Sequence, residues 1–138
     1  MFLMLLSFTF FKSGHITAET TASPPSPCDI HQRACTQPLS GGVGTVTLNI
    51  APKPVKAMAD LTFTVQLAGN SSKAPLYIDL DMPGMKMGQN RVELKQHSDG
   101  SYTGSGVIVR CPSGKTLWQA TVTVPGAGTA AFVFNAVY

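Results

Sequence analysis

In Leu61-Thr62-Phe63-Thr64-Val65-Gln66-Leu67, every second residue is large and apolar and the residues between them are polar. A period of two is the pattern of a β-strand that buries one face and exposes the other. The same alternation recurs in six further segments, at residues 45–50, 76–81, 91–95, 102–110, 116–124 and 129–137. Turn-forming residues separate the segments, and no window has the helical period of 3.6. We therefore predict an all-β fold, an antiparallel β-sandwich of about seven strands.

The N-terminal end of the chain predicts export. Residues 1–11 are almost entirely apolar, and Lys12 and polar residues follow them. This run is shorter than the roughly 20 apolar residues of a membrane-spanning helix, and it fits the hydrophobic region of a signal peptide. We expect a signal peptide at 1–18, a lead-in rich in Pro, Ser and Thr at 19–43, and the sandwich domain at 44–138. The protein is then periplasmic or extracellular, membrane-tethered if the N-terminus stays uncleaved, with no integral membrane span.

Composition excludes two classes of function. The chain has 10 basic and 7 acidic side chains, a net charge of +3, and no basic run that alternates with aromatic residues. A groove that follows a nucleic acid strand needs such a run, so we expect no nucleic acid partner. The sequence also lacks a Gly-x-Ser-x-Gly, a phosphate loop, a His-Glu-x-x-His and a paired-carboxylate motif. We expect a protein that is not an enzyme.

Three cysteines, Cys28, Cys35 and Cys111, allow one disulfide and one remaining thiol in an exported chain. Sequence alone does not choose among the three pairings. His31 lies between the first two cysteines and gives Cys-x2-His-x3-Cys, which resembles half of a metal site. Because no second half follows, the favoured interpretation of this segment is a disulfide or a solvated lead-in.

The most distinctive chemistry lies in Asp81-Met82-Pro83-Gly84-Met85-Lys86-Met87, which holds three methionines in a short connection. Thioethers are soft, uncharged donors that suit Cu(I), and they bind without losing a proton. Pro83 and Gly84 favour a tight turn that can face more than one sulfur toward a common point. The alternative interpretation is that the methionines fill gaps at the open end of the core, since Met82 continues the inward phase of the preceding strand.

Strand alternation adds two candidate ligands to this loop. If consecutive strands run in opposite directions, the connections at 51–58, 82–90 and 111–115 share one end of the sandwich. Met58 and Cys111 are then predicted neighbours of the methionine loop, and His97 is predicted to lie at the other end. The predicted metal ligands are Met82, Met85, Met87, Met58 and Cys111, with Cu(I) as the metal.

The order of short motifs resembles that of a known family. An "MPxM" loop at Met82-Pro83-Gly84-Met85 precedes a "G-x-Y" strand start at Gly100-Ser101-Tyr102 and a "G-x-W-x-x-x-V" strand that includes Trp118 and Val122. Over residues 44–137 this order is similar to the YtkA-like domain and to the related FixH family. The resemblance implies an immunoglobulin-like sandwich outside the cytoplasm, with copper-handling or respiratory oxidase assembly proteins as partners. Its methionine motif falls on Met82 and Met85, and Lys86 and Met87 stand where many relatives have a histidine.

The rival prediction is an exported structural or interaction module whose methionine loop contacts a partner protein.

Overall fold

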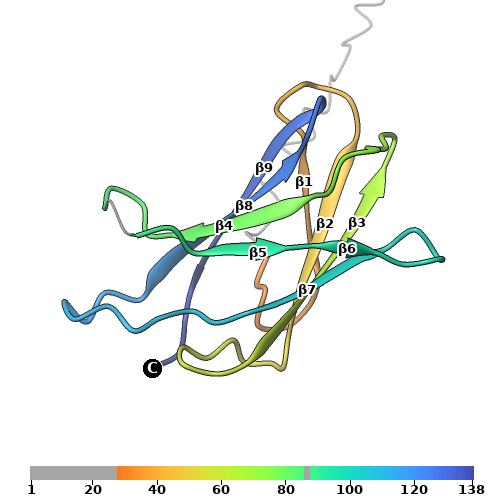
Figure 1. Cartoon of the computed structure of the whole chain (residues 1–138). Helices are drawn as coiled ribbons and strands as arrows, with labels where there is room; N and C mark the ends of the chain where they lie inside the picture. The colour runs from red at the N-terminus through yellow and green to blue at the C-terminus, as the bar shows by residue number, and fades with distance from the viewer. Residues whose placement is uncertain (1–27, 86–87) are drawn as a thin grey trace, which may run out of the picture.

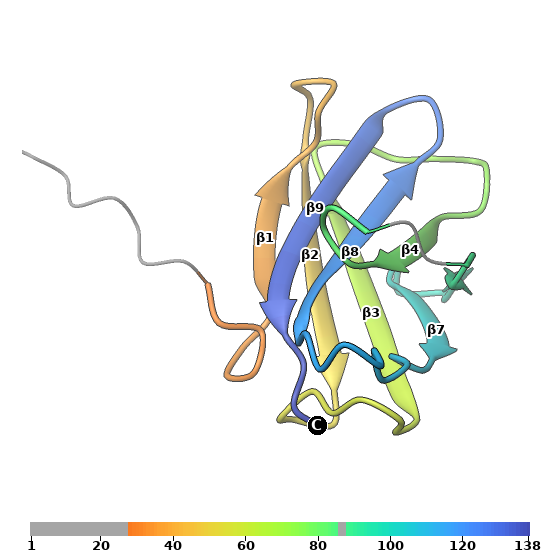
Figure 2. The same cartoon turned by 90° about the vertical axis from the view of Figure 1, so that its left-hand side faces the viewer.

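The computed structural model describes residues 28–85 and 88–138, and the predicted signal peptide at 1–18 lies outside them. Two antiparallel sheets pack against each other (Figure 1 and Figure 2). The first has the order β1-β2-β3-β7-β6, with β1 Cys35–Pro38, β2 Thr45–Ala51, β3 Leu61–Ala68, β7 Tyr102–Gly106 and β6 Lys95–Gln96. The second has the order β5-β4-β8-β9, with β5 Arg91–Glu93, β4 Tyr77–Asp81, β8 Leu117–Val124 and β9 Gly128–Asn135. The predicted all-β sandwich is confirmed, and the described residues form nine strands rather than about seven.

The core lies between the sheets and is built by alternate residues of each strand. In β2, Val46, Leu48 and Ile50 are fully buried, while Thr47 and Asn49 between them are partly exposed. Burial of a large aliphatic or aromatic side chain contributes about 1.5–3 kcal/mol, and this repeated burial is what holds the two sheets together. The largest fully buried side chains from other strands and connections are Trp118, Phe63, Leu61, Leu76, Ile78, Leu80 and Ile108.

The segment predicted as one strand at 91–95 forms two short strands in different sheets. β5 pairs with β4, and beyond Leu94 the chain pairs as β6 with β7. Leu94 is buried like Val92, so the inward phase continues through the change of sheet. This crossing segment closes one side of the sandwich (Figure 1).

Part of the segment predicted as the lead-in forms the other side of the sandwich. β1 pairs with β2, and Ile30, Cys35 and Leu39 are buried in the core. The backbone N–H of Ser40 donates to the carbonyl of Thr129 at 2.9 Å, which covers part of the free edge of β9. Composition hides this role because the strand is only four residues long and ends in a proline. No helix in the described ranges is long and apolar enough to span a membrane.

A candidate metal site at the methionine turn

The methionine loop begins as a tight turn at the end of β4. The backbone N–H of Met85 donates to the carbonyl of Met82 at 3.1 Å, and the two residues form an antiparallel bridge. Pro83 and Gly84 occupy the central positions, and Gly84 has a φ of 76°. Proline followed by a residue with positive φ defines a type II turn, which strongly favours glycine at the second position. The sequence Met-Pro-Gly-Met therefore closes on itself for local reasons.

The turn brings two thioethers to one face. Residues opposite each other in an antiparallel pair point to the same side, with Cβ atoms about 5 Å apart. Met82 is 3% exposed and continues the inward phase of Ile78 and Leu80, whereas Met85 is 36% exposed at the rim. Met87, the third predicted ligand of this loop, lies outside the described residues.

A shallow hollow of about 470 Å³ lies beside the turn. Residues 81–85 line it together with Gln119 of β8. Gln119 lies there because it pairs with Asp81 in the register of β4 and β8. Sequence reasoning did not identify Gln119, since only the register between two distant strands reveals this contact. The hollow thus combines two soft sulfur donors with the harder oxygens of Asp81 and Gln119.

The other two predicted ligands do not line this hollow. Met58 is 68% exposed with a φ of 59°, and its backbone N–H donates to the carbonyl of Ile108 at 2.7 Å. Met58 thus lies next to the connection between β7 and β8, the one that contains Cys111. β4 and β5 run across β2 and β3, which keeps the connection at 52–60 apart from the methionine turn in both views (Figure 1 and Figure 2).

Cys111 is a buried free thiol, 4% exposed. Its sulfur is 2.9 Å from the hydroxyl of Ser113, and its backbone N–H donates to the Tyr138 hydroxyl at 3.3 Å. The hydrogen bonds from the Ser113 hydroxyl and backbone, together with the charge of Lys115, hold the pKa of Cys111 below its usual range. The contacts of Cys111 thus come from Ser113 in the β7–β8 connection and from Tyr138 after β9.

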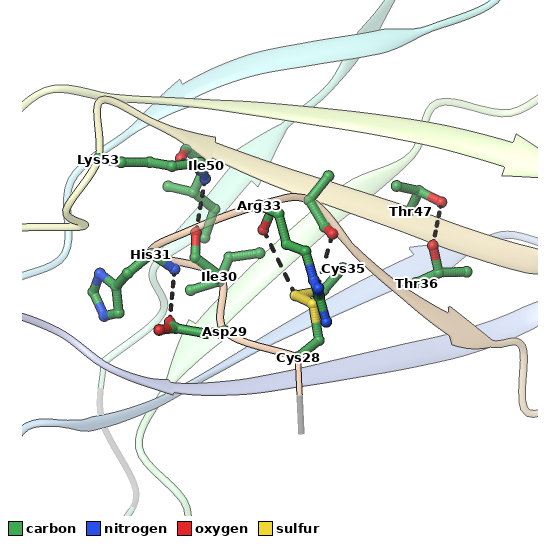
Figure 3. Close-up of a disulfide and its surroundings, with 11 residues drawn as sticks. Cys28, Asp29, Ile30, His31, Arg33, Cys35, Thr36, Thr47, Ile50 and Lys53 are labelled. Atoms are coloured by element: carbon green, nitrogen blue, oxygen red, sulfur yellow. Dashed lines mark hydrogen bonds between the residues drawn. A yellow bond between two sulfur atoms is a disulfide. The ribbon is translucent and has the colours of Figure 1, made fainter. Parts of the chain in front are cut away.

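Cys28 and Cys35 form a disulfide, which resolves the three pairings that the sequence left open (Figure 3). His31, in the same loop, binds backbone atoms through both ring nitrogens. Its Nδ1 accepts from the N–H of Val55 at 2.9 Å, so its Nε2 carries the proton and donates to the carbonyl of Asn135 at 2.6 Å. Both cysteines and the histidine of the Cys-x2-His-x3-Cys segment are therefore occupied, and the segment is a structural clasp rather than half of a metal site.

Another hollow, of about 510 Å³, lies away from the methionine turn. It lies along residues 91–96, the segment that crosses from one sheet to the other, and Tyr77 also lines it. The Arg91 guanidinium is bound by Asp79 at 2.8 Å and stacks 4.0 Å from the Tyr77 ring centre, so its charge is already compensated. His97 lies on the turn beyond β6, and its Nε2 is bound to the Thr103 hydroxyl.

Comparison of the chain with protein-family models, with curated proteins and with solved structures finds no match. The resemblance to the YtkA-like domain thus stays a prediction that rests on the short motifs alone. Within residues 28–85 and 88–138, no group of three or more His, Cys, Asp or Glu side chains could hold a metal ion.

Proposed function

We propose that this chain is a non-enzymatic, exported protein that binds and passes on Cu(I) through Met82 and Met85. The observation that carries the proposal is the type II turn, which pairs the two methionines on one face of the hairpin. A paired thioether site favours Cu(I) over harder divalent ions because sulfur without charge is a soft donor. Copper-handling or respiratory oxidase assembly proteins are the partners that would exchange the ion.

The position of the pair supports transfer rather than storage. Met82 is anchored in the core, so the turn keeps its shape when the ion leaves. Met85 lies at the rim of an open hollow, where a partner can approach the ion. Two thioethers bind an ion less tightly than a site that contains a thiolate, and weaker binding suits delivery.

A competition titration tests the proposal. The disulfide-intact protein would be titrated with Cu(I), held reduced by ascorbate, against a coloured Cu(I) chelator. We expect one ion per chain, and the Met82→Leu/Met85→Leu variant should bind at least about tenfold more weakly. Leucine keeps nearly the volume of methionine, so the fold should persist.

Two control variants locate the ion. Met58→Leu should bind as the unchanged protein does, because Met58 does not line the hollow. Cys111→Ser should also retain binding if the paired methionines hold the ion without the thiol. Equal affinity in the Met82→Leu/Met85→Leu variant and the unchanged protein would refute copper binding at the turn.

A partner-binding module is the second candidate, favoured by the exposure of Met85 beside an open hollow. Met→Leu substitutions would then preserve binding to the partner, because the contact is apolar. A Met85→Glu substitution would abolish it, since burial of an unpaired carboxylate in an interface is costly.

A further inference from the structure

A polar groove, of about 360 Å³, lies on the outer face of the first sheet. Four polar side chains from β2 and β3 form its floor. Thr47 lies opposite Gln66, and Asn49 lies opposite Thr64, so the four form two adjacent cross-strand pairs. They face outward because the alternate residues of both strands are buried. No hydrogen bond within the described ranges uses the side chains of Asn49, Thr64 or Gln66.

Two basic residues from different connections form the wall of this groove. Arg33 and Ala34 come from the loop closed by the Cys28–Cys35 disulfide, and Lys53 comes from the connection after β2. The Lys53 ammonium donates to the carbonyls of Ile30 at 2.7 Å and Ile50 at 2.9 Å, which fixes the head of this flexible side chain (Figure 3). One of its three N–H donors remains for a ligand.

The basic side chains of the groove form no ion pair within the described residues. The only ion pair in the described part of the chain is Arg91–Asp79, so neither Arg33 nor Lys53 has a carboxylate partner there. No acidic side chain lines the groove. Partial burial lowers the pKa of Lys53, and the nearby charge of Asp29 opposes this shift. An anion placed beside Lys53 would favour its charged form in the same way as Asp29 does.

We infer that this groove binds a small hydroxylated anion, such as a sugar acid or a sugar phosphate. The anionic group would lie between Arg33 and Lys53, and the hydroxyls of the ligand would lie on the amide and hydroxyl floor. Arginine matches carboxylate and phosphate geometry through two parallel N–H donors. Asn, Gln and Thr side chains both donate and accept, which suits hydroxyl groups. The volume is near the lower limit for small-molecule sites, and it fits one sugar ring rather than a polymer.

Isothermal titration calorimetry measures the affinity of the disulfide-intact protein for four probes and so tests this inference. The probes are glucuronate, glucose 6-phosphate, glucose and inorganic phosphate, at one pH and ionic strength. We expect at least one of the two anionic sugars to bind about tenfold or more tightly than both glucose and phosphate. Comparing the anionic sugars then shows whether a carboxylate or a phosphate is preferred. Binding of inorganic phosphate as tightly as the sugars, or binding of no probe, would overturn the inference.

Matched variants locate the site. Arg33→Gln should weaken binding of the anionic sugar by about tenfold, whereas Lys73→Gln, outside the groove, should not. Thr64→Val should also weaken binding, whereas Thr123→Val, on the outer face of the other sheet, should leave it unchanged. Reduction of Cys28–Cys35 should lower affinity because it frees the loop that carries Arg33. Equal affinities for Arg33→Gln and Lys73→Gln would place any binding elsewhere.

Discussion

Gly104 of β7 packs directly against the carbonyl oxygen of Glu93 in β5, where the chain leaves one sheet for the other. A Cβ atom at residue 104 would lie 2.9 Å from Cγ1 of Val92 and closer still to the Glu93 oxygen. β5 and β7 belong to different sheets, so this approach is what joins the two sheets along the closed side. Only a residue without a side chain allows it.

Gly104→Ala should therefore destabilise the fold by about 1–3 kcal/mol, because the obstructing atom is backbone and cannot rotate away. The matched control is Gly88→Ala, since nothing lies within 4 Å of a Cβ atom at that position. The control should change the free energy of unfolding by less than about 0.5 kcal/mol. Urea unfolding of both variants measures the difference, and equal stabilities would show that β5 can move away from β7.

Period-two alternation was sufficient to predict the sandwich, because burial on one face of each strand is what holds it together. Alternation could not show the change of sheet at Leu94, since a residue that points inward looks the same in either sheet. β7 ends at Gly106, earlier than the predicted residue 110, although Ile108 stays buried beyond the last pairing. In most strands the buried residues are also the paired ones, but at the end of β7 burial continues beyond the last paired residue.

The candidate site was only partly predictable, for a related reason. Met82, Pro83, Gly84 and Met85 form a local turn, so their geometry follows from adjacent residues. The position of Met58 relative to the methionine turn depends on the angle at which the two sheets cross. The order of the strands in the sequence does not determine this angle. For the same reason, the sequence does not predict the polar groove on the first sheet, where tertiary contacts bring Arg33 close to the connection that contains Lys53.

Loss of the Cys28–Cys35 disulfide should lower the free energy of unfolding by about 2–3 kcal/mol, the range for closure of a short loop. Cys28→Ala/Cys35→Ala would be compared with the oxidised protein by urea unfolding. Dithiothreitol should destabilise the unchanged protein and Cys111→Ala alike, and it should not affect the double variant. A shift of the double variant in dithiothreitol would contradict the assigned pairing.

The Asp99 turn should make stability depend on pH. Its carboxylate accepts from the Ser101 hydroxyl at 2.7 Å and from the Ser101 N–H at 2.9 Å, which lowers the pKa of Asp99. The unfolded state then binds a proton more readily, so this contribution is complete above the ordinary Asp pKa of about 3.9 and is lost as the pH falls through the lowered value.

Asp99→Asn removes the charge and keeps the acceptor oxygen, which isolates the effect of ionisation. The variant should unfold at lower urea than the unchanged protein near pH 6, and the two midpoints should converge as the solution is acidified. A difference between the midpoints that does not change with pH would mean that the ionised form is not what the turn stabilises.

The Tyr138 hydroxyl joins the last residue to the β7–β8 connection and to the core. It donates to the carbonyl of Lys115 and accepts from the Trp118 indole N–H at 3.4 Å and from the Cys111 N–H at 3.3 Å. Tyr138→Phe would leave the indole N–H of fully buried Trp118 without this partner, at a cost of about 1–2 kcal/mol.

Tyr77→Phe is the matched control, because the Tyr77 hydroxyl makes no hydrogen bond within the described ranges. Trp118 is the single tryptophan, so its fluorescence reports the loss directly. An unchanged emission spectrum in Tyr138→Phe, together with unchanged stability, would show that the hydroxyl does not hold the indole in place.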